Sequence, residues 1–172
     1  MSVKTIITEP NKILRQISEP VKKVEKEEQS LMDDMLDTMY AADGIGLAAI
    51  QIGVAKRIIV MDISWNRGEK KPMYFVNPVI RNKDKEKSIY EEGCLSVPNQ
   101  FAEIERPKKC EVEYLNYEGE KKLLKAEGLL ATCIQHEMDH LEGILFIDYL
   151  SKLKKSMIIK KLLKNRPDRI IV

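Results

Sequence analysis

The sequence predicts an α+β fold in which short antiparallel β-sheets pack around a central buried helix, followed by an amphipathic C-terminal helix. Two observations support this prediction. Apolar residues recur at helical spacing over residues 30–42, 128–141 and 151–165. Segments between these helices are β-branched and aromatic, or alternate in polarity, as strands do. A chain of 172 residues with 44% hydrophobic residues is expected to form one domain, residues 1–172.

The first of these helices is expected to begin at Ser30. Ser30 is a suitable N-cap residue, and Asp33 follows three positions later, just as the apolar periodicity begins. The next predicted elements are two strands, over residues 57–62 and 73–80. Because proline cannot donate a ladder hydrogen bond, Pro78 indicates that the second strand lies at an edge or contains a bulge.

The second half of the chain is predicted to contain a hairpin and two helices. Residues 81–87 alternate in charge and are expected to form a solvated loop or the end of a hairpin, and residues 111–125 are expected to form a hairpin. The helix over residues 128–141 is apolar around most of its axis, which predicts burial. Pro167 is expected to terminate the last helix. The apolar stripe of that helix comprises Leu150, Leu153, Met157, Ile158 and Leu162.

Composition argues against several classes of protein. Lys and Arg (29) nearly balance Asp and Glu (27), and a net charge of +2 gives no electrostatic case for a nucleic-acid binder. No apolar run approaches the roughly 18 residues needed to cross a bilayer, and the N-terminal residues resemble neither a secretory signal nor a transit peptide. The three cysteines are odd in number and scattered, which argues against a disulfide framework. We therefore expect a monomer in the reducing cytosol, where a thiol is free to bind metal.

The only two histidines of the chain fall in one pentapeptide, HEMDH, at His136 and His140. On a helix, residues four apart lie on one face, so both imidazoles can bind one divalent metal. Glu137 between them would lie beside the open coordination position as a general base. Burial of two imidazoles and a carboxylate without partners in such an apolar helix would cost several kcal/mol. A metal ion bound to the imidazoles would offset this cost.

The segment after this motif excludes one class of metalloprotease. The metzincin pattern requires a third histidine, but Phe146 stands at that position, although Gly143 fits. A thermolysin-like site would use a glutamate from a later helix, and the last helix contains none. Asp148 and Asp168 are weak substitutes. We therefore expect the third metal ligand to lie before the HExxH motif in the sequence.

Three cysteines compete for the place of third ligand. Cys94 lies in the segment EEGCLSVP (residues 91–98), whose glycine and proline indicate an irregular, closely shaped backbone. Cys133 precedes His136 by one turn, but three ligands would then crowd one helix face. Cys110 opens a strand among charged residues. Spacing favours Cys94 without deciding the matter, since a free cysteine is most often a small buried hydrophobe.

Three motifs together resemble the signatures of the peptide deformylase family. They are GIGLAAIQ at residues 44–51, EGCLS at residues 92–96 and QHEMDH at residues 135–140, in the order found in that family. The resemblance implies that Cys94, His136 and His140 bind the metal. It also implies ferrous iron as the physiological ion, with Zn²⁺, Ni²⁺ or Co²⁺ able to substitute. The implied reaction is hydrolysis of the formyl group from formyl-methionine at the N-terminus of nascent peptides, releasing formate.

The resemblance also implies roles for residues around the metal. Glu137 would take a proton from the attacking water and return it to the departing amine. The Gln51 side-chain amide and the Leu95 backbone N–H would stabilise the oxyanion of the tetrahedral intermediate. The methionine side chain needs an apolar pocket, for which the candidates are Ile45, Gly46, Gly93, Leu129, Thr132, Cys133 and His136. Glu92 and Arg106 resemble an ion pair that braces the cysteine segment.

Two features depart from the pattern of the family. Relatives commonly carry an aliphatic residue where Thr132 stands, which bears on pocket polarity. They often carry an acidic residue at the position of Asn99 and a basic residue at that of Phe101, so contacts with the peptide backbone are expected to differ.

Alternative interpretations of the motifs give other functions. Gly44, Gly46 and Ala49 match a dinucleotide fingerprint, and Asp62 ends a strand at a suitable distance, but that fingerprint must follow a strand and here follows a helix. An HExxH metallopeptidase acting on unformylated peptides is the main alternative enzyme, and a non-catalytic metal-binding domain would not need Glu137. The last helix carries six lysines, which either form a solvated face or dock on ribosomal RNA. They are Lys152, Lys154, Lys155, Lys160, Lys161 and Lys164.

Overall fold

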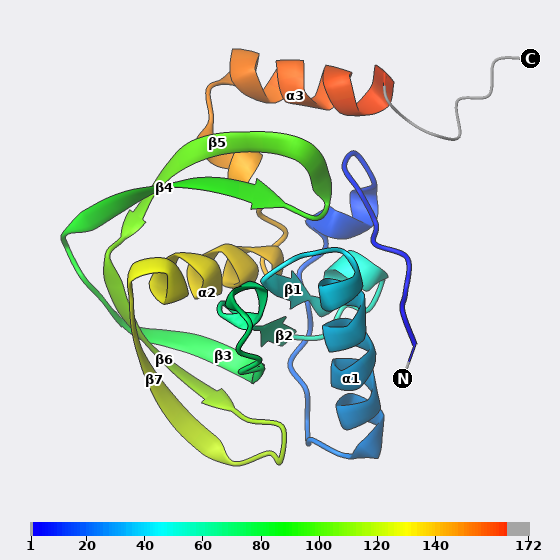
Figure 1. Cartoon of the computed structure of the whole chain (residues 1–172), viewed down its shortest axis with the longest axis vertical. Coiled ribbons are helices and arrows are strands. Elements are labelled where there is room, and N and C mark those ends of the chain that lie inside the picture. Colours follow the sequence, from blue (N-terminus) through cyan, green and yellow to red (C-terminus); the bar gives the residue numbers. More distant parts are fainter. Residues whose placement is uncertain (1, 165–172) are drawn as a thin grey trace, which may run out of the picture.

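The structure is a computed structural model that describes residues 2–164. Three α-helices and seven strands make up most of it (Figure 1). The helices are α1 (Lys26–Ala41), α2 (Gly128–His140) and α3 (Lys152–Lys164). The strands are β1 (Gly46–Ala48), β2 (Ile58–Met61), β3 (Met73–Lys83), β4 (Lys87–Cys94), β5 (Val97–Pro107), β6 (Lys109–Leu115) and β7 (Lys121–Glu127).

The strands form two separate antiparallel sheets with α2 between them. Five strands form one sheet in the order β1-β2-β3-β6-β7, and β4 pairs only with β5. Helix α2 contacts strands of both sheets, and Figure 1 shows it enclosed between them. Eight of its thirteen residues are buried, because the apolar positions surround the axis and have protein on every side. The predicted fold class and the buried central helix are confirmed.

Helix α1 packs on β1 and β2 and begins earlier than its apolar pattern indicates. Its N-cap is Glu25, not Ser30, which lies inside the helix, so that prediction was wrong. The Glu28 side chain accepts a hydrogen bond of 3.0 Å from the Glu25 backbone N–H, and this reciprocal cap satisfies donors that would otherwise lack a partner. The first turn of α1 is polar, and its buried side chain is the charged Glu28, so hydrophobic periodicity could not reveal it.

The predicted strands and hairpin of the five-stranded sheet are confirmed. The predicted strand 57–62 is observed as β2, and the strand predicted at 73–80 extends to Lys83 as β3. The pairing of β3 with β6 shifts in register between Val76 and Val79, which confirms a bulge at Pro78. β6 and β7 pair in continuous antiparallel register, as expected for the hairpin at 111–125.

The hairpin formed by β4 and β5 was not predicted. Residues 81–83, expected in a loop, belong to β3, and only residues 84–86 connect it to β4. The segment around Cys94, expected to be irregular, is a regular strand up to Cys94, followed by a tight turn into β5. The hairpin exposes charged residues on one face, so its sequence resembles a solvated loop. Its irregularity is confined to a register shift between Gly93 and Cys94.

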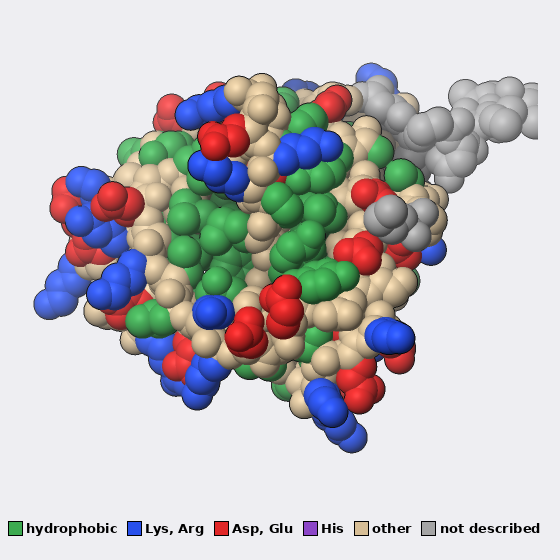
Figure 2. All heavy atoms as spheres, turned by 60° about the horizontal axis from the view of Figure 1, so that its bottom comes forward, with side chains coloured by type: hydrophobic (Ala, Val, Ile, Leu, Met, Phe, Trp, Pro, Cys, Tyr) green, Lys and Arg blue, Asp and Glu red, His purple; other side chains and the backbone are tan. Residues whose placement is uncertain are grey.

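Helix α3 lies across the outer side of β5 (Figure 1). Ile158 is buried, but Leu153 and Met157 are 71% and 50% exposed, so only part of the predicted apolar stripe is covered. Asn165 and Pro167, predicted at the end of this helix, lie outside the described residues. Within residues 2–164, no helix has the length and apolar character to span a bilayer. Figure 2 shows side chains of both charge signs around one face, in keeping with the small net charge.

Candidate metal centre

Helix α2 carries both histidines on one face, one turn apart. Their ring centroids lie 5.2 Å apart, and both side chains are buried. Cys94, at the end of β4, directs its Sγ to within 3.4 Å of the Nε2 atom of His140. One ligand atom from each of these three residues lies within 4.8 Å of the others. The structure therefore brings together the three residues that the sequence resemblance implied as ligands.

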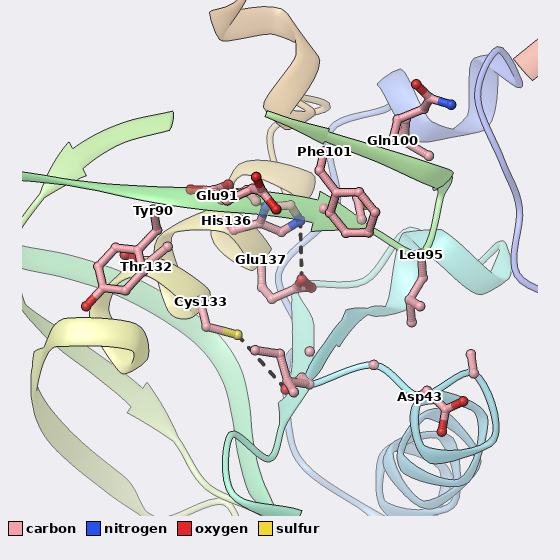
Figure 3. A pocket seen from close by; sticks show the side chains of 18 of the residues that line it. Asp43, Tyr90, Glu91, Leu95, Gln100, Phe101, Thr132, Cys133, His136 and Glu137 are labelled. Atoms are coloured by element: carbon pink, nitrogen blue, oxygen red, sulfur yellow. Dashed lines mark hydrogen bonds and ion pairs between the residues drawn. The ribbon is translucent and has the colours of Figure 1, made fainter. Parts of the chain in front are cut away.

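The other two cysteines are placed differently. The Cys133 Sγ lines the cavity and lies 4.0 Å from the backbone oxygen of Ile45 (Figure 3). Cys110 is buried in β6, where it packs into the apolar core. Burial raises the pKa of both thiols, which favours the uncharged form. Neither belongs to the cluster of ligand atoms found among residues 2–164.

A buried ion pair fixes the orientation of His136. Its Nδ1 lies 2.8 Å from a Glu92 carboxylate oxygen, and Arg106 donates two hydrogen bonds of 2.6 and 2.9 Å to the same carboxylate. Burial raises the pKa of Glu92, but the bonds from His136 and Arg106 outweigh it and hold that pKa below its usual value. An anionic Glu92 accepts a hydrogen bond from the Nδ1–H of His136, which directs Nε2 to the cluster. The predicted pair of Glu92 and Arg106 is confirmed.

Removing the positive partner of this ion pair should destabilise the fold. Arg106 is 4% exposed and also donates a hydrogen bond of 2.8 Å to Asp139 on α2. We expect Arg106→Met to lower the free energy of unfolding by about 3 kcal/mol, because the buried carboxylate of Glu92 and the half-buried one of Asp139 lose their counter-charge. Urea denaturation measures this change. Arg81→Met is the matched control, since Arg81 pairs with Glu113 at the surface and should cost less than about 1 kcal/mol. Equal losses in the two variants would contradict the argument.

Glu137 is a carboxylate without a full set of partners. It is 3% exposed, and its Oε2 atom has no hydrogen-bond partner within the described part of the chain. Its Oε1 atom lies 3.6 Å from the Nε2 of His136 (Figure 3). Burial raises its pKa to about 7, and the nearby Glu92 adds to the rise, against the lowering effect of His136. A carboxyl with such a pKa can both accept and release a proton near neutral pH.

The donor set fits a divalent metal ion. Burial lowers the pKa of His140, so its imidazole is neutral and its Nε2 lone pair is available. Its Nδ1, like Glu137 Oε2, is buried without a partner among residues 2–164. Burial lowers the pKa of His136, but its hydrogen bonds with Cys94 and Glu92 outweigh burial and raise that pKa well above its usual value, so metal binding there would displace a proton. Two imidazoles and a thiol that converge in this way form a ligand set typical of zinc or iron. Three protein ligands leave a position free for water or substrate, as in catalytic sites.

Gln51 is held beside the cluster by its own local structure. It lies in a short 3₁₀-helix, Ala49–Ile52, and its side-chain oxygen accepts a hydrogen bond of 2.9 Å from the Ala48 backbone N–H. Its Nε2 donates to Ser96 Oγ at 3.0 Å and lies 3.7 Å from Cys94 Sγ. The amide is thus fixed with its N–H groups toward the cluster. Sequence reasoning missed Ser96, although it belongs to the EGCLS motif.

A cavity of about 490 Å³ opens onto this centre (Figure 3). All seven residues proposed from the sequence for a substrate pocket line it, and so does Leu95. Asn99 and Phe101, expected from the sequence to affect peptide contacts, line it too. Tyr90, Val97 and Pro98 also line it but were not proposed, because nothing in their spacing indicates that the β4–β5 hairpin folds over α2. The proposed residues are Ile45, Gly46, Gly93, Leu129, Thr132, Cys133 and His136.

Gly46 allows the chain to approach α2 closely. A Cβ atom at this position would lie 2.9 Å from Glu137 Cγ, closer than real Cβ atoms approach, and a tight 3.1 Å from Cys133 Sγ. Glycine is therefore needed for packing against the HExxH helix. The motif follows helix α1 and not a strand, so the context that a dinucleotide fingerprint requires is absent.

The fold and the site define the class of this protein: a metal-dependent hydrolase of the HExxH type, with a cysteine as the third candidate ligand. The chain belongs to the polypeptide deformylase family, whose model matches residues 3–156. Enzymes of this family are metal-dependent and remove the formyl group from the N-terminus of nascent peptides, and this chain is such an enzyme. The resemblance seen in the three motifs is confirmed, and the metallopeptidase alternative is not favoured.

Named relatives and solved structures agree with this assignment. The chain is 77% identical to a peptide deformylase of Pelagibacter ubique, over all of both chains. It is 58% identical to one of Phenylobacterium zucineum, covering 96% of this chain and 98% of the relative. A crystal structure of the Ehrlichia chaffeensis peptide deformylase in complex with actinonin has a TM-score of 0.92 and 46% identity, covering 96% of this chain and 99% of that one.

Proposed function

We propose that Cys94, His136 and His140 hold one ferrous ion at which the formyl group of formyl-methionyl peptides is hydrolysed. The convergence of these three side chains beside an apolar cavity is the observation that carries the proposal. When bound, the ion supplies Lewis acidity, which polarises the formyl carbonyl and lowers the pKa of a water toward 7. Zn²⁺, Ni²⁺ and Co²⁺ suit the same ligands and would substitute.

Glu137 is the proposed general acid–base group. Its carboxylate takes the proton of the attacking water and passes it to the nitrogen that leaves when the formyl C–N bond breaks. The raised pKa of Glu137 suits both steps, because the same group must hold the proton between them. The products are formate and a free N-terminal methionine. The absence of a side chain at Gly46 leaves room for the Glu137 side chain at the cavity.

Gln51 and Leu95 are the proposed oxyanion donors. Gln51 Nε2 lies within 3.7 Å of Cys94 Sγ and is oriented by two hydrogen bonds, so it is preorganised for a charge that forms next to the cluster. Leu95 follows Cys94 in the tight turn between β4 and β5. Its position next to Cys94 supports the proposal that its backbone N–H donates to the same oxygen. Each such donor contributes roughly 3 kcal/mol to catalysis.

The cavity is the proposed binding site for the methionine side chain. Ile45, Leu129 and Cys133 give it apolar walls, and His136 at its base connects it to the candidate metal ligands. A structural relative binds actinonin, and we propose that such an inhibitor would occupy this cavity in the present enzyme as well. Nucleophile, acid–base group and pocket would then act on one bound formyl-methionine.

Formate release from a formyl-Met tripeptide tests the proposed function. The enzyme, purified without oxygen, should release one formate per peptide, contain about one iron per chain and leave the unformylated peptide intact. The unformylated peptide serves as the control for peptidase activity. Cleavage of peptide bonds without formate release would reject the proposal.

Exposure to air should inactivate the iron-loaded enzyme. A ferrous centre with an open coordination position reacts with oxygen, and the Cys94 thiolate is itself open to oxidation. We expect most activity to be lost within hours of aeration, while nickel-substituted enzyme kept in parallel stays active. The measurement is the rate of formate release by the iron-loaded and the nickel-substituted enzyme at intervals during aeration. An iron-loaded enzyme that keeps full activity through the same aeration would contradict the choice of metal.

Docking on the ribosome through α3 is a second proposal. Its lysines surround Leu153 and Met157, which are exposed, so the helix offers a basic surface with an uncovered apolar strip. Alanine replacement of Lys154, Lys160 and Lys161 together should weaken co-sedimentation with ribosomes and spare hydrolysis of a short formyl-peptide. Replacement of Lys121, Lys122 and Lys125 on β7 is the control for lost charge alone. Unchanged co-sedimentation of the α3 variant would reject this docking surface.

A further inference from the structure

A buried hydroxyl without a partner lies in the wall of the catalytic cavity. It belongs to Thr132 on α2, one turn before His136 and next to Cys133. The side chain is 4% exposed, and its Oγ1 has no hydrogen-bond partner anywhere in residues 2–164. Figure 3 shows Thr132 on the cavity side of α2, between Tyr90 and Cys133. Two other buried hydroxyls, Ser18 and Ser88, also lack partners in the described chain, but neither lines this cavity.

The state of this hydroxyl is unusual for a helix. A helical threonine commonly bonds back to the carbonyl four residues earlier, which here is Gly128. Thr132 makes no such bond, so its donor remains available. An unpaired buried hydroxyl destabilises the folded state, and valine, which has the same shape, would avoid that cost. A ligand that supplies a hydrogen-bond acceptor inside the cavity would also remove the cost of the unpaired hydroxyl.

We infer that the Thr132 hydroxyl donates a hydrogen bond to the thioether sulfur of the substrate's methionine and thereby distinguishes methionine from side chains of equal shape. The inference rests on the proposed function, because it takes the cavity as the methionine pocket. A thioether sulfur is a weak acceptor, whereas a methylene group accepts nothing. Norleucine has the shape of methionine with a methylene in place of sulfur. When a norleucine side chain fills the pocket, the Thr132 hydroxyl would remain buried and without a hydrogen-bond partner.

This asymmetry gives the pocket a selectivity that apolar walls alone lack. A purely apolar pocket separates two side chains of equal shape poorly, whereas a site that offers a hydrogen bond rejects the analogue that cannot accept it. Leu129, Ile45 and Cys133 provide apolar contact for either side chain. Among the side chains considered for this pocket, Thr132 has the donor that is buried and unpaired. We therefore assign the preference of the pocket for methionine over norleucine to the Thr132 hydroxyl.

The test compares formyl-Met-Ala-Ser with formyl-norleucyl-Ala-Ser in three forms of the iron- or nickel-loaded enzyme. For the unaltered enzyme, we expect kcat/KM to favour the methionyl peptide by about tenfold. Thr132→Val removes the hydroxyl and keeps the shape, so the ratio should fall to within about twofold of unity. Thr132→Ser keeps the hydroxyl and removes the methyl group, so most of the preference should remain. Metal content and thermal unfolding show that each variant is loaded and folded.

The outcomes separate this inference from the function on which it rests. Formate release from both peptides at equal kcat/KM by the unaltered enzyme would overturn the role of the hydroxyl and leave the proposed function intact. An unchanged ratio in Thr132→Val, or a lost preference in Thr132→Ser, would overturn it as well. If neither peptide released formate, the proposed function would fail and the inference with it.

Discussion

Glu137→Gln is expected to lower the rate of formate release by about 10³-fold while the protein keeps its metal. The amide preserves the shape of the carboxylate but cannot accept the water proton, and acid–base catalysis of this kind contributes roughly 10²- to 10⁴-fold. Glu137 is buried beside His136, and an oxygen without a partner in the described chain is available for the proton. Steady-state kinetics on a formyl-Met tripeptide, with metal content measured on the same sample, give the result.

Glu142→Gln is the matched control for this loss. Glu142 lies just beyond the end of α2 and pairs with Arg57 at 2.6 Å, away from the cavity. The same chemical change there should alter the rate less than about twofold, since a surface pair contributes little. A Glu137→Gln enzyme with a full metal load and a rate within tenfold of the unaltered one would show that another group moves the proton.

Cys94→Ala is expected to abolish stoichiometric metal binding and, with it, activity. Two histidines on one helix would remain, and a pair of imidazoles without the thiolate holds a divalent ion far more weakly. Equilibrium dialysis against Ni²⁺ or Co²⁺, followed by metal analysis, measures the change without relying on turnover. We expect the bound metal to fall from about one ion per chain to well below one at micromolar metal.

The other two cysteines provide the comparison. Cys110→Ala alters a residue of the β6 core, and Cys133→Ala alters one that lines the cavity and points toward the Ile45 carbonyl. Both variants should keep the metal, although the second should change substrate preference. Loss of metal in Cys133→Ala together with its retention in Cys94→Ala would reverse the assignment of the third ligand.

The sequence predicted those features of the site that depend on local spacing. His136 and His140 lie four residues apart in a strongly helical segment, so their common face and the position of Glu137 follow from helix geometry. The choice among Cys94, Cys110 and Cys133 was different. It depends on which strand folds over α2, and spacing contains no information on that contact. Only the resemblance of the EGCLS motif favoured Cys94 decisively, and the structure brings that sulfur to the histidines.

The errors in the fold have a common physical origin. The first turn of α1 is capped by Glu25 and Glu28, and the β4–β5 hairpin exposes charged side chains, so neither carries a regular apolar pattern. Both are stabilised by contacts that periodicity does not report. Ser96 was missed for a related reason: its role is to receive a hydrogen bond from Gln51, a residue 45 positions away. Such pairings arise only from tertiary structure.

The separation of the two sheets has a consequence for how the enzyme acquires its ion. Cys94 belongs to a hairpin that shares no ladder with the larger sheet, whereas both histidines belong to a helix that begins more than thirty residues later, at Gly128. A chain still under synthesis, or one in which the hairpin has detached, can offer at most an incomplete set of donors. With the proposed ligands, tight capture of the metal would be reserved for molecules that have finished folding, and the ion, once captured, would fasten the hairpin to the helix.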